Sequence, residues 1–181
     1  MTSEQRDQVC HLLESSFSAL NVAVNSLSDS QWAFRPAPSV WSAAQCVEHL
    51  VEVETGVNGR IQALLLDGFS EPGLCAEAIG KERLLRRAVP SRTRRAEAPR
   101  QPANSIEFSA PNTALTVFQS VRERTLAFAR TTQDEVERYV YPHFVFGQLN
   151  IYQWLLMLSL HCERHTAQIE ELKANPEFPT A

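Results

Sequence analysis

The chain has 181 residues, of which 44% are hydrophobic and 21% charged, a composition typical of one globular domain that can bury a core. Its formal net charge of -4 argues against general nucleic-acid binding, which depends on a basic surface. The longest uninterrupted apolar run, residues 154–158, is far shorter than the roughly 20 residues that cross a bilayer, so no membrane span is expected.

The N-terminal part predicts two long helices separated by a loop. Residues 3–27 carry apolar side chains at steps of three and four residues, the pattern of an amphipathic helix. The prolines within residues 36–38 then enforce a loop. Ser42 and Gln45 have the spacing of a capping box, which predicts that a second helix begins there and runs to about residue 68.

A long connection follows, from about residue 68 to residue 111. Five prolines punctuate it, and only residues 75–88 predict a short helix. A connection of this length in a small domain is usually a crossover or a functional cover. Residues 81–100 hold eight basic side chains against two glutamates, so this part of the connection is able to meet an anion.

The C-terminal part predicts two further long helices. The first covers about residues 112–131. Residues 139–147 are aromatic and contain a proline, which favours an ordered loop. Asn150, with Gln153 three residues later, then caps a helix that ends near Ala174.

These elements together predict an all-α fold. Four long helices with one extended connection between the second and the third make a four-helix bundle with a crossover. We expect a single domain over residues 1–181, with the crossover at about residues 68–111. Strand-like alternation is absent at useful length.

Histidines are the most informative candidates for a functional site. His161 and His165 are four residues apart in the last helix, so both imidazoles point the same way. His49 lies at the edge of the apolar stripe of the second helix and can supply a third ligand. Three imidazoles with an open fourth position are typical of a catalytic metal site. In the simpler alternative, each histidine is only hydrogen-bonded or half-exposed.

Two sequence motifs strengthen the metal-site prediction. Residues 41–50, Trp-Ser-Ala-Ala-Gln-Cys-Val-Glu-His-Leu, resemble the Trp-Ser-x-x-(Glu/Gln)-x-x-x-His-Leu signature of the DinB-like family of metal-dependent four-helix bundles. Residues 146–155, followed by residues 161–169, are similar to the closing helix of that family. The resemblance covers roughly residues 5–172, and the helical layout expected above agrees with the bundle of that family.

The resemblance also implies a ligand set and a range of activities. It places the metal-binding histidines at His49, His161 and His165, with nickel or zinc as the usual ion. Related proteins include thiol transferases that use a low-molecular-weight thiol such as bacillithiol or mycothiol. The family name refers to damage-inducible expression and does not imply DNA binding. Because imidazole suits zinc, nickel, copper and iron alike, the residues themselves do not name the metal.

The predicted function follows from the charge of such a site. A divalent ion held by three neutral ligands can lower the pKa of bound water or stabilise a thiolate. We therefore expect a metal-dependent hydrolase or thiol S-transferase that acts on a small-molecule substrate. One alternative is a metal- or ligand-binding stress-response protein without turnover. Another is a structural, dimerising bundle whose histidines hold no ion.

Other polar residues are weaker candidates. His143 is considered as a fourth ligand or a general base, against the commoner case of a solvated loop histidine. Gln168 is considered as a residue that orients a ligand or the bound water. Arg92, Arg94 and Arg95 are considered as holders of a carboxylate or phosphate on a substrate or thiol cofactor, should the crossover fold over the open end of the bundle.

The remaining charged and thiol side chains near the histidines are expected to be structural. We expect Glu48, Glu52 and Glu163 to be solvated helix charges, and Cys46 and Cys162 to be small apolar fillers. The four cysteines form no Cys-x-x-Cys pair, and no charged-then-apolar leader opens the sequence. These features favour a reducing cytoplasm, and a homodimer is compatible with them.

Overall fold

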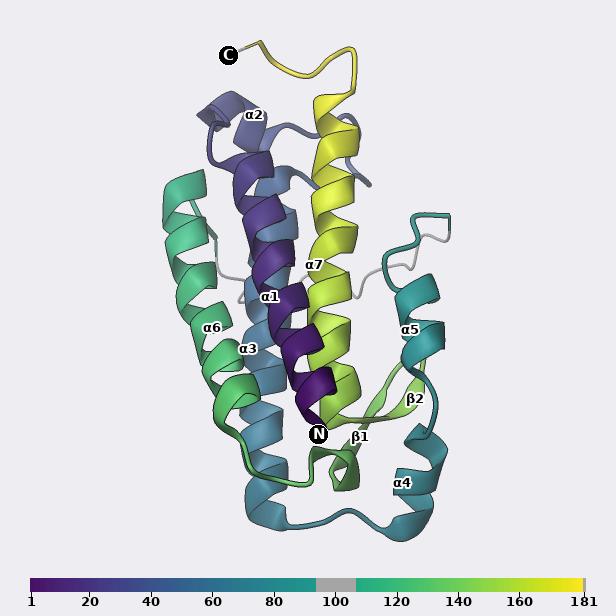
Figure 1. Ribbon diagram of the computed structural model, residues 1–181. Helices are drawn as coiled ribbons and strands as arrows, with labels where there is room; N and C mark the ends of the chain where they lie inside the picture. The colour runs from purple at the N-terminus through teal and green to yellow at the C-terminus, as the bar shows by residue number, and fades with distance from the viewer. Residues whose placement is uncertain (94–106, 181) are drawn as a thin grey trace.

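The computed structural model describes residues 1–93 and 107–180, and four long helices dominate it (Figure 1). These helices are α1 (Ser3–Val24), α3 (Ala43–Asp67), α6 (Pro111–Thr131) and α7 (Ile151–Lys173). Both α1 and α3 pack against α6 and α7, so α1 lies diagonally across the bundle from α3. This arrangement confirms the predicted all-α four-helix bundle.

The direction of the helices explains the long crossover. In Figure 1, α1 and α7 run upward from the end of the bundle that carries the N-terminus, whereas α3 and α6 run downward. Because α3 and α6 are consecutive long helices that point the same way, the chain must return along the bundle between them. The predicted crossover between the second and third long helices is therefore confirmed.

Side-chain caps fix where the long helices begin. Ser42 accepts from the backbone N–H of Gln45, and the Gln45 side chain accepts from the N–H of Ser42. Asn150 and Gln153 form the same reciprocal pair at the start of α7. At the end of α3, Gly68 adopts a positive φ of 93°, which a residue without Cβ adopts without strain. The caps predicted from the sequence are thus present.

The connection between α3 and α6 differs in detail from the prediction. The single helix expected over residues 75–88 is wrong, because two short helices, α4 (Pro72–Ala78) and α5 (Glu82–Ala88), stand in its place. Gly80 separates them with a φ of 77°, which cannot continue a right-handed helix. A further short helix, α2 (Asp29–Ala33), follows α1, which ends at Val24 rather than near residue 27.

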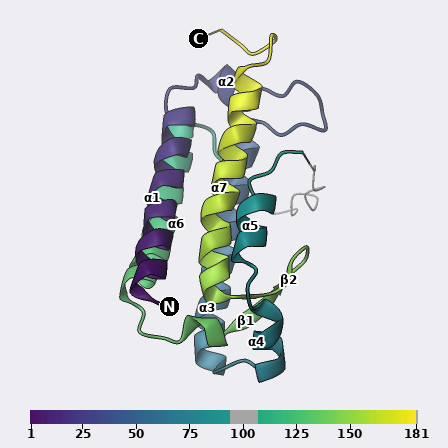
Figure 2. The same cartoon turned by 45° about the vertical axis from the view of Figure 1, so that its right-hand side comes forward.

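A small antiparallel hairpin replaces the loop expected over residues 139–147. A 3-10 turn, η1 (Val136–Arg138), leads into β1 (Val140–His143), which pairs with β2 (Gly147–Asn150) so that Tyr141 lies opposite Leu149. Gly147 begins β2 with a φ of 65°, which suits the tight turn between the strands. Figure 2 shows α5 and the hairpin on the side of α7 that faces away from α1 and α6.

A buried polar layer divides the core into two apolar clusters. Nη2 of Arg122 lies 2.7 Å from Oε2 of Glu54, and both side chains are 2% exposed. The guanidinium also donates to the carbonyl of Leu13 at 2.6 Å and to Ser16 Oγ at 3.0 Å. Thr125 Oγ1 donates to Glu54 Oε1 at 2.7 Å. The layer therefore joins α1, α3 and α6 near mid-height of the bundle.

None of the helices in the part of the chain that the structure describes is long and apolar enough to span a membrane.

Candidate metal centre

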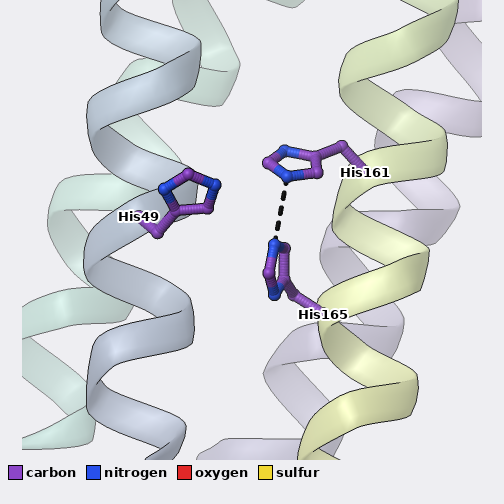
Figure 3. A group of neighbouring side chains, drawn as sticks. All are labelled: His49, His161 and His165. Atoms are coloured by element: carbon purple, nitrogen blue, oxygen red, sulfur yellow. Dashed lines mark hydrogen bonds between the residues drawn. The ribbon is translucent and has the colours of Figure 1, made fainter. Parts of the chain in front are cut away.

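Three histidines converge in the space between α3 and α7 (Figure 3). His49 comes from α3, and His161 and His165 come from successive turns of α7, which runs antiparallel to α3. The two Nε2 atoms of His161 and His165 lie 3.0 Å apart. One ring nitrogen from each of the three histidines lies within 4.8 Å of the others. The structure thus brings together all three residues that the sequence singles out.

The spacing fits the requirements of a divalent ion. Two nitrogens bound at about 2.0–2.1 Å to a tetrahedral ion lie about 3.3 Å apart. The 3.0 Å between Nε2 of His161 and Nε2 of His165 is close to that value, and one ring nitrogen of His49 lies within 4.8 Å of a ring nitrogen of each. The donor set, three imidazoles without a carboxylate, suits zinc and its divalent neighbours. The cluster therefore indicates a divalent metal.

Burial keeps the three imidazoles neutral. It lowers the pKa of His49 from 6.5 to about 4 and that of His161 to about 3. The pKa of His165, which is 6% exposed, is also lowered by burial, and then by its neighbours His161 and His49. A neutral imidazole keeps the lone pair that a metal needs. At neutral pH the cluster is accordingly ready to bind a cation without first losing protons.

The same pKa shifts predict how stability depends on pH. The unfolded chain takes up protons as the pH falls below 6.5, whereas His49 in the folded chain resists protonation until about pH 4. The free energy of unfolding of the metal-free protein is therefore expected to decrease as the pH is lowered from 6.5 to about 4. Urea denaturation in the presence of a chelator at a series of pH values measures the slope.

A matched pair of variants isolates the contribution of the cluster. His161→Gln removes one buried imidazole and is expected to make the slope shallower, whereas His11→Asn changes an exposed histidine and should leave it as it is. Equal slopes in the wild type and in His161→Gln would contradict the explanation.

Trp41 packs against two of the three histidines, a role that the sequence prediction did not assign to it. Its ring stacks on His165 with centroids 5.8 Å apart and an interplanar angle of 14°, and it makes an edge-type contact with His49 with centroids 5.0 Å apart. The Nδ1 atoms of His161 and His165 are buried and have no hydrogen-bond partner among the described residues. Aromatic packing therefore orients these rings where a hydrogen-bonded carboxylate or carbonyl often does so.

The cluster opens into a cleft of about 1630 Å³ that runs along α7. The lining side chains of α7 follow in order: Trp154 and Met157 toward its N-terminal end, the two histidines in the middle, and Gln168 and Glu171 toward its C-terminal end. The other walls come from the loop before α3, from α3 and α5, and from the hairpin. A substrate can thus extend from the histidines in either direction along the helix.

The weaker candidates lie at different places relative to the cleft. His143 lines it from the hairpin, and Gln168 lines it from α7. Arg92 also lines it, where Nη2 lies 2.8 Å from Glu171 Oε2 and Nη1 donates to Gln168 Oε1 at 3.2 Å. Arg94 and Arg95 lie outside the described residues. The catalytic or cofactor-binding roles considered for these residues stay predictions.

The carboxylates near the histidines are less solvated than expected. Glu48 is only 5% exposed, and its Oε1 accepts from the backbone N–H of Phe108 at 3.1 Å, so the expectation of a solvated charge is wrong there. Glu52 lies in the cleft wall, one turn along α3 from His49. Glu163 is half-buried, and burial raises its pKa. The sequence places these residues mostly away from the ligand side of their helices but does not reveal the segments that cover them.

The two cysteines beside the histidines are closed off from the cleft. Cys46 and Cys162 are fully buried, and burial raises the pKa of both thiols, that of Cys162 to about 11. Cys162 donates to the carbonyl of Ser16 at 3.4 Å, toward the polar layer. A protonated, buried thiol is a poor nucleophile, which agrees with the expected role as apolar filler.

The fold and the site define a four-helix-bundle protein with a three-histidine cluster at the centre of an open cleft. The family model of the DinB superfamily matches residues 12–169, and the chain belongs to that superfamily. This finding confirms the resemblance drawn from residues 41–50 and from the closing helix.

Two individual proteins are similar to the chain. The uncharacterized protein YuaE of Bacillus subtilis (strain 168) is 26% identical over 153 residues, which cover 83% of this chain and 88% of YuaE. The solved structure of YfiT from Bacillus subtilis matches with a TM-score of 0.62 and 20% identity, over 94% of this chain and 87% of YfiT. YfiT is described as a probable metal-dependent hydrolase with an unusual four-helix bundle topology. At this identity the likeness establishes the fold.

Proposed function

We propose that the protein is a metal-dependent hydrolase that acts on a small molecule, with His49, His161 and His165 as the ligands of a divalent ion. The observation that carries the proposal is the convergence of three neutral imidazoles at the middle of an open cleft. The description of YfiT as a probable metal-dependent hydrolase supports it. Zinc or nickel is the ion that the family resemblance favours.

The chemistry needs an external nucleophile. When bound, a divalent ion with three neutral ligands polarises a carbonyl or phosphoryl group and generates a nucleophile from water or a thiol near neutral pH. None of the four cysteines lines the cleft, so the chain provides no thiol of its own there. Glu52 lines the cleft and follows His49 by three residues, which is a rise of about 5 Å along the axis of α3. We assign Glu52 as the proton acceptor.

Reconstitution with single metals tests the proposal. We expect protein stripped with a chelator to regain hydrolysis of a panel of 4-nitrophenyl esters when zinc or nickel is restored. Glu52→Gln should lower kcat by about 10²–10⁴ while it keeps the ion, because it removes the proton acceptor and not a ligand. Glu123→Gln, which changes an exposed side chain of α6, is the matched control.

Other outcomes assign the site differently. Metal-dependent consumption of an added thiol by 1-chloro-2,4-dinitrobenzene, without ester hydrolysis, would favour thiol transfer over hydrolysis. A bound ion with neither activity would favour the non-catalytic binding protein.

A further inference from the structure

Strand β1 points two polar aromatic side chains toward the same end of the cleft. Alternate residues of a strand share a face, so Tyr141 and His143 lie on the same face of β1, and both line the cleft, as does Pro142 between them. Tyr141 stacks on Trp154 with centroids 4.1 Å apart and an interplanar angle of 4°. The indole Nε1 of Trp154 donates to the carbonyl of Tyr141 at 3.3 Å. This end of the cleft is therefore held in place by α7.

The hydroxyl group of Tyr141 is a donor without a protein partner. Its oxygen is buried and makes no hydrogen bond to any described residue, although the side chain lines the cleft. Burial raises the pKa of Tyr141, so the group stays a protonated O–H. An unsatisfied buried donor costs about 1–3 kcal/mol, which a bound acceptor would recover.

The imidazole of His143 presents a second donor. Its Nδ1 accepts from the backbone N–H groups of Val145 at 3.0 Å and Phe146 at 3.3 Å. Because Nδ1 accepts both bonds, the proton of the neutral ring must be on Nε2. Burial lowers the pKa of His143 to about 4, so the ring is neutral at pH 7. Because His143 lines the cleft, its Nε2–H is the donor that the neutral ring has available for a bound acceptor.

The position along α7 sets how far this end lies from the histidine cluster. Trp154, on which Tyr141 stacks, precedes His161 by two helical turns, or about 10 Å of helix. Tyr141 and His143 thus lie beside a part of α7 that is about two turns from the histidine cluster, within reach of the far end of a molecule that reacts there.

We propose that Tyr141 and His143 form a two-donor subsite that binds an uncharged carbonyl group, such as an amide or ester, on the far arm of the substrate. Both donors are neutral, which suits a carbonyl oxygen better than an anion, and the rings of Phe144 and Phe146, which line the cleft beside His143, suit a flat apolar neighbour of that carbonyl. The subsite adds a substrate-binding feature to the proposed function. The inference rests on that proposed function, because it treats the cleft as a substrate site.

We use benzamide and toluene as probes. Both have a flat aromatic ring, but only benzamide has a carbonyl group. Their affinities are to be measured by ligand-observed NMR with the full chain, with added zinc and with a chelator. Tyr141→Phe is expected to weaken benzamide binding roughly three- to ten-fold, the loss of one hydrogen bond, and to leave toluene binding equal or tighter. His143→Asn should act alike, because the Asn side-chain oxygen can replace Nδ1 in the turn but offers no donor at Nε2.

Two control variants complete the design. Tyr139→Phe and His11→Asn make the same chemical changes at residues that do not line the cleft, and should leave both affinities as in the wild type. Thermal melting checks folding, and Tyr141→Phe should not lower Tm because its hydroxyl has no bond to lose among the described residues.

The selectivity for benzamide over toluene decides the outcome. Wild-type selectivity in both Tyr141→Phe and His143→Asn would overturn the subsite, as would an equal loss of both probes. Since neither residue belongs to the histidine cluster, benzamide binding that persists with the chelator keeps the subsite even if the metal proposal fails.

Discussion

Replacing His161 or His165 by alanine is expected to abolish stoichiometric metal binding and to lower the melting temperature of the metal-loaded protein. Each change removes one of three converging ligands and leaves a site with two. An ion present at 100 times its Kd stabilises a folded chain by about 2.7 kcal/mol. In a chain of this size, that loss corresponds to about 5–10 °C in Tm.

Metal analysis of protein purified without a histidine tag checks the expectation, together with melting curves recorded with and without added zinc. His11→Ala, at an exposed position on α1, controls for the loss of a histidine as such and should keep one ion per chain. The assignment is rejected if both cleft variants also keep one ion per chain.

Replacing Arg122 by methionine is expected to destabilise the protein by about 3–5 kcal/mol, because it leaves the Glu54 carboxylate buried without its cation. Arg130→Met removes a second ion pair of the same helix, that with Glu14, whose side chains are 55% and 49% exposed. Exposed pairs contribute at most about 1 kcal/mol, so this control should cost little. Urea denaturation of both variants measures the difference.

The double variant Arg122→Met, Glu54→Leu separates two explanations of that loss. If the penalty comes from the stranded carboxylate, removing it as well should restore much of the lost stability. Equal destabilisation by Arg122→Met and Arg130→Met would show that burial of the ion pair is not what matters.

Local patterns were sufficient to predict the bundle. The boxes at Ser42 and Asn150 place two helix starts because the capping partners are three residues apart in the sequence. The break at Gly80 was missed because a lone glycine is compatible with a helix until the surrounding fold selects its φ. The hairpin was missed because its strands have only four residues each, too few for a clear alternation.

The candidate site could be predicted only in part. The four-residue spacing of His161 and His165 fixes their relation within one helix, and the motif around His49 supplied the third member. The stacking of Trp41 on His165 and the burial of Glu48 depend on segments distant in the chain, and no spacing rule encodes such contacts. The pairing of Arg122 with Glu54 was invisible for the same reason.

The placement of the histidines also bears on the order of events during synthesis. His49 is made early, whereas His161 and His165 belong to the last helix, α7. A nascent chain that still lacks α7 holds one of the three imidazoles and cannot retain an ion through them. If the three histidines hold an ion as proposed, metal loading must therefore follow the emergence of α7, and the bound ion would then bridge α3 to α7.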